Sequence, residues 1–303
     1  MALEITSVNN PRVKEAMRLR DRRGRDRQGR IIIDGLRECL RAIGAGLNHG
    51  ELFLCPEHLD EQQLTTINET LGDSPVHLTR VTDEVFRKIA FGNRAEGVIL
   101  VTPRPDTALQ DLPLGTNPLV AVLEHVEKPG NLGAVIRSAD AAGVSAVVVV
   151  DGGTDLYNPN AIRASLGAIF QMPIAAGTAD ETIEWLRRRD ITMFATRVDG
   201  AVNYTNVDFC KPAAIVLGSE SLGLSDRWRD DDMQAITVPM LGIVDSLTSR
   251  PRPPYCSTKP SGNGVRRSPH SLSDERTYFA TRSTNDACRQ GRTSGPGFPA
   301  RLH

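Results

Sequence analysis

The segment from Ala213 to Leu247, around which the predicted sheet is organised, reads A-A-I-V-L-G-S-E-S-L-G-L-S-D-R-W-R-D-D-D-M-Q-A-I-T-V-P-M-L-G-I-V-D-S-L. Its first five residues are apolar and end at Gly218, which indicates a buried strand. A second apolar run over residues 235–238 stops at Pro239, because proline cannot donate to a strand ladder. A polar, glycine-bearing loop follows each predicted strand. Ligands of open α/β sheets sit beyond the carboxyl ends of the strands, so we expect both loops at one functional edge.

The residues before this stretch predict the rest of a parallel sheet. Residues 146–150 contain four consecutive valines, which is typical of a strand buried on both faces. Further strands are expected at 119–123 and 191–195. Asn158 is expected to cap a helix that begins at Pro159. The helices predicted here are 133–142, 159 to about 170, 180–188 and a short one capped by Asp226.

The N-terminal third alternates between strand-like and helix-like segments, which predicts a small α/β domain. We expect strands at 30–34, 52–55, 77–81 and 96–101, and helices at 35–45, 59–71 and 83–90. Residues 104–117 are rich in Pro, Gly and Thr and show no period, which favours a linker. The predicted organisation is an N-terminal domain at 1–103, this linker, and a second α/β domain at 118–247.

Composition excludes several classes of protein. No apolar run approaches the roughly 20 residues that cross a bilayer, and the N-terminus lacks the pattern of a signal peptide. The five cysteines are scattered without a C-x-x-C pair, and His125 stands alone, so neither a metal site nor a disulfide framework is indicated. We therefore expect a reduced, cytoplasmic protein without a membrane segment or a metal. No G-x-G-x-x-G or P-loop motif follows any strand, which disfavours a generic nucleotide-binding enzyme.

A strongly basic segment lies between Asn10 and Arg30, where Pro11 is suited to the first turn of a helix. Lysine and arginine side chains that neutralise phosphates dominate non-specific affinity for nucleic acids. The segment therefore predicts either an RNA-binding surface or a solvated charged face, and the residues alone leave both open. The predicted RNA-binding residues are Arg12, Lys14, Arg18, Arg22, Arg23 and Arg25.

Asn131 and Arg137 lie on the loop and first turns after the first strand of the second domain. Arg137 is carried by an otherwise apolar helix, and an unpaired buried charge is costly, so its guanidinium needs a partner. One interpretation is a structural ion pair with Glu220. The other is an arginine presented to an anionic or hydroxylic substrate at the edge of the sheet.

Three motifs follow predicted strands in a fixed order: N-L-G-A-V-I-R-S-A-D-A-A-G from Asn131, V-L-G-S-E-S-L-G-L from Val216, and V-P-M-L-G-I-V-D-S-L from Val238. Together they resemble the SpoU (TrmH-type) branch of the SPOUT RNA 2′-O-ribose methyltransferases, over about residues 119–247. The resemblance implies an α/β-knot methyltransferase domain. The basic N-terminal domain is similar to that family's RNA substrate-binding domain, with Asp34 where the family usually has Glu.

The resemblance implies a role for each matched residue. Asn131 and Arg137 form the first motif, and Arg137 would engage the target ribose and help to deprotonate its 2′-hydroxyl. Glu220 would position Arg137 and the substrate, and Ser246 would supply the hydroxyl of the third motif. A ribose hydroxyl is a poor nucleophile until a positioned base activates it. The cofactor implied is S-adenosylmethionine, with its adenosine cradled by Gly218, Val238, Met240 and Leu247. Asn158, Arg163 and Gly167 also match family positions, although Asn158 is interpreted first as a helix cap.

The chain departs from the family pattern after Leu247. The family continues with Asn-Val-Ser and an aliphatic helix that closes the cofactor pocket, threads the knot and forms a homodimer interface. Here residues 248–303 are rich in Pro, Ser, Arg and Gly, carry 10 Lys/Arg against 3 Asp/Glu, and predict a disordered tail. One back-translation of residues 248–260, shifted by one base, reads N-V-S-A-A-A-A-V-L-L-Y-E-A. We hypothesise a one-base frameshift at Leu247/Thr248 and expect weakened cofactor binding and dimerisation for the chain as written.

The sequence thus predicts an S-adenosylmethionine-dependent RNA ribose methyltransferase. The separate N-terminal domain favours ribosomal RNA over transfer RNA as the substrate. The alternatives are an RNA-binding protein of the same fold without catalysis, and a transfer-RNA methyltransferase. Cofactor binding separates the first alternative from an enzyme.

Overall fold

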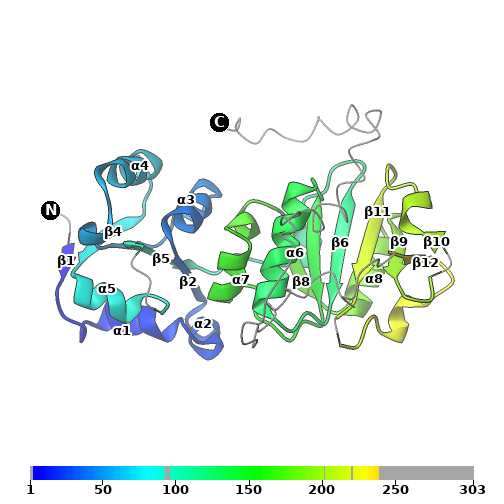
Figure 1. Ribbon diagram of the computed structural model, residues 1–303, viewed down its shortest axis with the longest axis horizontal. Helices are drawn as coiled ribbons and strands as arrows, with labels where there is room; N and C mark the ends of the chain where they lie inside the picture. The colour runs from blue at the N-terminus through cyan, green and yellow to red at the C-terminus, as the bar shows by residue number, and fades with distance from the viewer. Residues whose placement is uncertain (1–2, 93–95, 201, 220, 239–303) are drawn as a thin grey trace, which may run out of the picture.

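The computed structural model describes residues 3–92, 96–200, 202–219 and 221–238. Two α/β units lie side by side along the long axis of the molecule, with the N-terminal unit in blue and cyan and the C-terminal unit in green and yellow (Figure 1). Each unit is built on its own sheet. The α/β fold expected from the sequence is confirmed, whereas the tail at 248–303 and the expected knot segment lie outside the described residues.

The N-terminal unit has a five-stranded mixed sheet with the order β1-β4-β3-β5-β2. Strands β1, β4 and β3 are parallel, and β5 pairs antiparallel with both β3 and β2. Its strands are β1 (Leu3–Ile5), β2 (Arg30–Asp34), β3 (Glu51–Leu54), β4 (His77–Val81) and β5 (Val98–Pro103). Its helices are α1 (Pro11–Arg18), α2 (Arg22–Gln28), α3 (Leu36–Gly44), α4 (Glu61–Leu71) and α5 (Asp83–Ile89).

Helices cover both faces of this sheet. Buried side chains of α1 and α5 pack with Phe53 and Ile99 on one face, and those of α3 and α4 pack with Leu52 and Leu100 on the other. Local signals start the helices where expected, since the Asn10 side chain accepts a hydrogen bond from the backbone N–H of Arg12 at the start of α1. The sequence missed the short edge strand β1.

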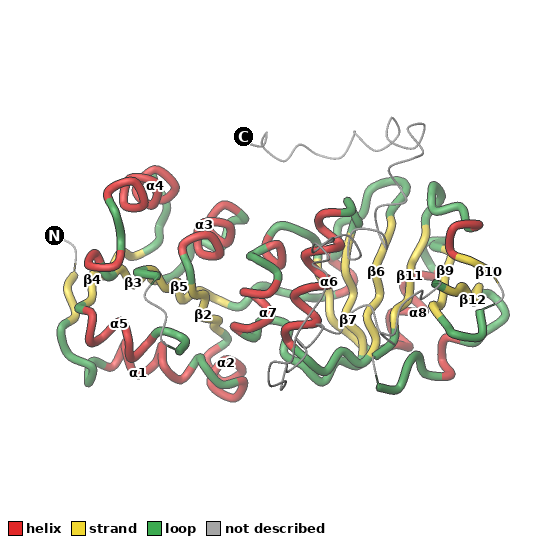
Figure 2. The backbone as a smooth tube through the Cα atoms, in the orientation of Figure 1, coloured by secondary structure: helices red, strands yellow, loops and turns green. Residues whose placement is uncertain are grey.

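The C-terminal unit has a seven-stranded parallel sheet with the order β10-β12-β9-β11-β6-β7-β8. Its strands are β6 (Leu119–Glu124), β7 (Ala146–Val150), β8 (Ile174–Gly177), β9 (Thr192–Thr196), β10 (Val202–Asn203), β11 (Ala213–Leu217) and β12 (Met233–Thr237). Helices α6 (Pro129–Ala141) and α7 (Pro159–Ala164) lie on one side of the sheet, and α8 (Ala179–Arg187) packs against its other face (Figure 2). Strands β11, β6 and β7 are neighbours in the sheet and are almost entirely buried, as their apolar runs predict.

Three predictions for this unit were wrong in detail. Helix α6 begins at Pro129, four residues before the predicted start, because proline fits the first helical turn. Helix α7 ends at Ala164 and not near Phe170, because Leu166 and Gly167 adopt positive φ angles of 55° and 81°. Strands β8 and β10 were not expected.

The two units share one apolar core. The cluster that includes Ile31 and Ala42 of the N-terminal unit continues without a break to Tyr157 and Ile162 of the C-terminal unit. At its border the Arg25 guanidinium lies 2.6 Å from the Asp155 carboxylate, and both side chains are buried or nearly so. We call this contact region, formed by α2, β2 and α3 against residues 153–171, the junction. No helix of the described part is long and apolar enough to cross a membrane.

Candidate active site

The direction of the chain through the parallel sheet changes at β6. From β6 the chain moves to β7 and β8 on one side, and then returns to β9 and β11 on the other. The loops that follow β6 and β11 therefore leave neighbouring strands in opposite directions. Such a topological switch point opens a crevice at the carboxyl ends of the strands, where open α/β sheets bind ligands. The first two sequence motifs begin at this point.

Helix α6 presents the first motif along one half-exposed face. Leu132, Ile136 and Ala139 are buried against the sheet, while Ala134 and Ser138 stay partly accessible. At about 100° per residue, the half-exposed positions span about 120° of the helix. The structure places Asn131 and Arg137 at the two borders of this face, about two turns apart along the helix axis.

The loop after β11 carries the second motif and folds back on itself. Ser219 and Gly223 exchange backbone hydrogen bonds of 3.1 and 3.0 Å, and the Ser219 hydroxyl accepts a hydrogen bond from the backbone N–H of Leu222. A Cβ atom at position 218 would lie 2.2 Å from the carbonyl carbon of Gly223. Glycine is therefore required at 218 by closure of the loop itself, in addition to any approach of a ligand.

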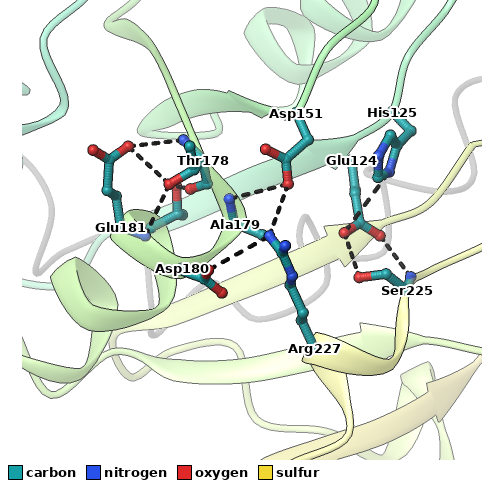
Figure 3. A network of polar contacts seen from close by, with 10 residues as sticks. Glu124, His125, Asp151, Thr178, Ala179, Asp180, Glu181, Ser225 and Arg227 are labelled. Carbon is teal, nitrogen blue, oxygen red and sulfur yellow. Dashed lines mark hydrogen bonds and ion pairs between the residues drawn. The ribbon is translucent and has the colours of Figure 1, made fainter.

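A buried carboxylate fastens the end of this loop to β6 (Figure 3). Glu124, the last residue of β6, is 0% exposed. Its two oxygens accept hydrogen bonds from the backbone N–H and the hydroxyl of Ser225, both at 2.7 Å. Ser221 in the same loop donates to the carboxylate of Glu127, which precedes α6. Glu124 was missed from the sequence, although a glutamate that ends an apolar strand is an available signal because burial of a charge demands partners.

The same contact corrects the prediction for Asp226. The short helical turn Asp226–Trp228 begins after Ser225, so Ser225 and not Asp226 occupies the cap position. The Ser225 side chain makes no capping hydrogen bond because it points to Glu124 instead. Trp228 is 1% exposed and anchors this turn against the α8 face of the sheet.

A second polar cluster lies beside the first, at the ends of β7 and β8 (Figure 3). The Asp151 carboxylate accepts a hydrogen bond from the backbone N–H of Ala179 and lies 3.4 Å from the Arg227 guanidinium. Thr178 caps α8, and hydrogen bonds from its backbone N–H and hydroxyl hold the pKa of Glu181 below its usual range. These contacts bring the loops after β7, β8 and β11 together at one edge.

The remaining predicted site residues are only partly described. Val238 directly follows β12, which is separated from β11 by β9, so Val238 and Gly218 lie at the same edge of the sheet. Glu220, Met240, Ser246 and Leu247 lie outside the described residues. Within the described ranges, no three His, Cys, Asp or Glu side chains are grouped as metal ligands.

Asn158 caps α7, which confirms the prediction that this residue caps the helix beginning at Pro159. Its side-chain oxygen accepts a hydrogen bond of 2.9 Å from the backbone N–H of Asn160. A cavity of about 410 Å³ lies near this turn and is lined by residues 104–107 and 155–157. It belongs to the linker side of the junction, and neither Asn131, Arg137 nor Gly218 lines it.

The predicted RNA-binding residues fall into two groups. Lys14, Arg18, Arg22 and Arg23 are exposed on α1 and α2. Arg12 is half-buried and pairs with Glu51 at 2.5 Å.

Arg25 requires a correction. Its side chain is buried, ion-paired with Asp155 and hydrogen-bonded to the carbonyl oxygen of Leu19, so it holds the junction and is removed from the RNA-binding set. The exposed part of α2 nevertheless lies close to the carboxyl edge of the parallel sheet, because Arg22 donates to the carbonyl oxygen of Gly153 in the loop after β7.

Comparison with known proteins agrees with this geometry. Residues 118–248 match the SpoU rRNA Methylase family, and residues 10–100 match the MRM3-like substrate binding domain. The first match ends at residue 248, where the chain departs from the motif pattern.

Relatives and solved structures cover most of the chain. The 23S rRNA (uridine(2479)-2′-O)-methyltransferase of Streptomyces viridochromogenes is 26% identical over 82% of this chain and 88% of its own length. The AdoMet-bound rRNA methyltransferase from Sinorhizobium meliloti is 27% identical with a TM-score of 0.71, over 81% of this chain and 92% of that one. The crystal structure of an RNA 2′-O ribose methyltransferase is 34% identical with a TM-score of 0.68, over 81% of this chain and 93% of that one. The chain therefore belongs to the SpoU family of RNA 2′-O-ribose methyltransferases.

Proposed function

We propose that this protein transfers a methyl group from S-adenosylmethionine to a ribose 2′-hydroxyl of ribosomal RNA. The observation that carries the proposal is the position of Asn131 and Arg137 on the half-exposed face of α6, at the switch point of a parallel sheet. A polar, glycine-bearing loop from β11 closes beside the same edge. An arginine and an amide bordering one accessible helix face suit recognition of a hydroxyl among phosphates.

Arg137 has the central role in the proposed reaction. The guanidinium would contact the target ribose and favour loss of the 2′-hydroxyl proton, because an adjacent positive charge stabilises the developing oxyanion. Asn131 would orient the ribose or the arginine through its amide. Glu220 is proposed to position Arg137, and Ser246 to supply a hydroxyl near the reacting oxygen.

The described residues fit a nucleoside-bearing cofactor at the same edge. Gly218 follows β11 and Val238 follows β12, and only β9 separates these two strands at the edge of the sheet. The tight Ser219–Gly223 turn keeps the loop after β11 compact. Gly218, Val238, Met240 and Leu247 would hold the adenosine. When bound, S-adenosylmethionine supplies an activated methyl group, and the protein supplies orientation.

Ribosomal RNA is proposed as the substrate on two grounds. The N-terminal unit matches a substrate-binding domain, and the Streptomyces relative is named for a uridine of 23S rRNA. The exposed basic residues Lys14, Arg18, Arg22 and Arg23 would contact phosphates on both sides of the target nucleotide, because phosphate contacts position a nucleic acid without reading its sequence.

Assembly and location follow the same proposal. A family-type homodimer is proposed for the in-frame gene, and weakened dimerisation for the chain that carries residues 248–303 as written. The proposed location is the cytoplasm, where ribosomal RNA is accessible.

The experiment is a map of 2′-O-methylated positions in RNA from cells with and without the gene. We expect one ribosomal position to lose its methyl group in the deletion strain and to regain it on complementation. Complementation with Arg137→Ala should not restore it. Loss of a transfer-RNA methylation would move the substrate to transfer RNA, and an unchanged map of both RNAs would overturn the proposal.

A further inference from the structure

The strongest unassigned feature of the described chain is the buried Glu124 at the end of β6. Polar groups are buried only with hydrogen-bond partners, and a charged group needs particularly good ones. Glu124 obtains both of its short hydrogen bonds from Ser225, which lies 101 positions later in the chain. The ring Nδ1 of His125 lies 3.9 Å from the same carboxylate. Within the described part of the chain, no lysine or arginine forms an ion pair with Glu124.

The partner of Glu124 is a loop and not a piece of the sheet framework. Strands β6 and β11 are already held together by a five-residue parallel register from Leu119–Ala213 to Leu123–Leu217. The Glu124–Ser225 contact lies beyond this register, so the sheet does not depend on it. The contact instead fixes the return of loop residues 221–225 toward β6.

The loop is tied to the residues before α6 at two points. Ser225 binds Glu124, and Ser221 donates to Glu127 at 3.2 Å. Both glutamates precede α6, the helix that carries Asn131 and Arg137. The two ties therefore set the position of the second-motif loop relative to the first-motif helix.

The Ser225 side chain binds Glu124 and does not cap the helical turn that follows it. A serine before a helical turn ordinarily caps the turn with its hydroxyl. Ser225 occupies that position before Asp226–Trp228, yet it makes no capping hydrogen bond and its hydroxyl donates to Glu124. The local signal is overridden by a contact across the site, which is the pattern of a functional constraint.

We propose that Glu124 is a positioning residue for methyl transfer: it holds loop residues 221–225 against the start of α6, so that this part of the loop keeps its distance from the helix that carries Asn131 and Arg137. The inference rests on the proposed function and deepens it. Misplacement of reacting groups by about 1 Å costs about 100-fold in rate, so a clamp of two hydrogen bonds at this point acts on the reaction and not only on stability.

The test compares Glu124→Ala, Glu124→Gln and Ser225→Ala with the control Asp180→Asn in the full chain. Asp180 is an exposed carboxylate at the same edge, 3.7 Å from Arg227, and lies outside the clamp. The measurements are kcat and KM for methyl transfer to ribosomal RNA, the Kd of S-adenosylmethionine by calorimetry, and the thermal midpoint. Assays are run well below the lowest midpoint, so that every variant is folded.

Glu124→Ala should lower kcat by about 10- to 100-fold. Glu124→Gln keeps an acceptor for the Ser225 N–H and should recover most of the rate. Ser225→Ala should lie between them because the backbone contact survives, and Asp180→Asn should match the wild type. A Glu124→Ala variant that loses only thermal stability, with kcat and Kd unchanged, overturns the inference, as does a Glu124→Gln variant no better than Glu124→Ala.

A local probe separates failure of the inference from failure of the proposed function. Trp228 follows Ser225 by three residues, is 1% exposed, and is one of two tryptophans in the chain. In a Trp185→Phe background, Glu124→Ala should shift the Trp228 emission to the red and increase its quenching by acrylamide. If the protein with Glu124 intact shows no methyl transfer while Glu124→Ala still shifts the Trp228 emission, the clamp is retained and the proposed function is lost. Unchanged emission overturns the clamp itself.

Discussion

The junction and the carboxyl edge of the parallel sheet each bury a charged side chain, and the two regions pair that side chain in different ways. At the junction the Arg25 guanidinium meets an opposite charge on Asp155 and a carbonyl oxygen of Leu19. At the edge the Glu124 carboxylate meets the N–H and hydroxyl of Ser225. The junction is thus a charge-neutral lock between two units, while the edge joins a carboxylate to a loop through neutral donors. Helices α6 and α7, which pack on each other, connect the two regions.

Arg137→Ala, at the carboxyl edge of the parallel sheet, should have the largest effect on activity. If the edge is catalytic, methyl transfer should fall by at least about 100-fold, because removal of a group that assists proton transfer typically costs 10²- to 10⁴-fold. Single-turnover transfer of a radiolabelled methyl group to ribosomal RNA measures the effect.

The control is Arg188→Ala, an exposed arginine at the end of α8. Its rate should equal that of the wild type, and the unfolding midpoint of Arg137→Ala should remain near the wild-type value. Undiminished transfer by Arg137→Ala would remove this residue from the reaction.

The Arg25–Asp155 ion pair at the junction is tested by Arg25→Ala. Removal of one partner leaves the Asp155 carboxylate buried without its counter-charge, which typically costs about 3–5 kcal/mol in free energy of unfolding. Urea unfolding followed by circular dichroism gives this value. The neighbouring exposed Arg23→Ala should change the free energy by less than about 0.5 kcal/mol.

A double variant tests whether Arg25 and Asp155 stabilise the protein as a pair. Arg25→Ala combined with Asp155→Ala should be less destabilised than the sum of the two single variants, because each single variant leaves an uncompensated charge. Strict additivity would show that the two side chains do not act as a pair.

The link between the two regions is tested by Gly133→Ala. A Cβ atom at 133 on α6 would lie 2.4 Å from the carbonyl oxygen of Ala161 and 2.6 Å from the Cβ of Ala164 on α7. We expect a loss of about 1–3 kcal/mol in stability, in the range of overpacked cores.

The matched control is Gly130→Ala on the same helix, where a Cβ atom meets nothing within 4 Å. Alanine is the better helix former, so this variant should be neutral or slightly more stable by urea unfolding. Equal effects of the two substitutions would contradict the close approach of α6 and α7.

The smallest expected effect concerns the basic surface next to the junction. Arg18→Ala and Arg23→Ala should each weaken RNA binding by a few fold and lower the slope of log K against log salt by about 0.7–0.9 per lost phosphate contact. Titrations by fluorescence anisotropy at several salt concentrations measure both quantities. Arg188→Ala again serves as the control, and an unchanged slope for both α1–α2 variants would place the RNA elsewhere.

Much of the fold was predictable because apolar periodicity and caps agree with the tertiary structure. The strands at Arg30–Asp34, His77–Val81, Ala146–Val150 and Ala213–Leu217 have the predicted limits. The misses have local physical causes. Strands β1 and β10 have only three and two residues and owe their pairing to a neighbouring strand. The end of α7 depends on a positive φ at Leu166, for which leucine gives no signal.

Arg137 could be singled out from the sequence because a guanidinium on an otherwise apolar helix needs a partner. The roles of Asn131 and Arg137 in the reaction stay predictions. Glu124 and the burial of Arg25 were missed because both depend on partners more than 100 positions away in the chain. The sequence alone indicates that a buried charged side chain needs a partner. Which charged side chains are buried, and which residues pair with them, is determined by the fold.

The apolar cluster that runs from Ile31 to Ile162 has a consequence for how such chains are assembled. Cutting the chain within residues 104–117 would expose a continuous apolar surface on both halves, so each half expressed alone should be prone to aggregation. A fusion that exchanged the N-terminal unit for a different RNA-binding module would have to provide a complementary surface for α7 as well as new contacts to RNA. The N-terminal unit and α7 therefore share one hydrophobic core, although the segment between the two units has the composition of a linker.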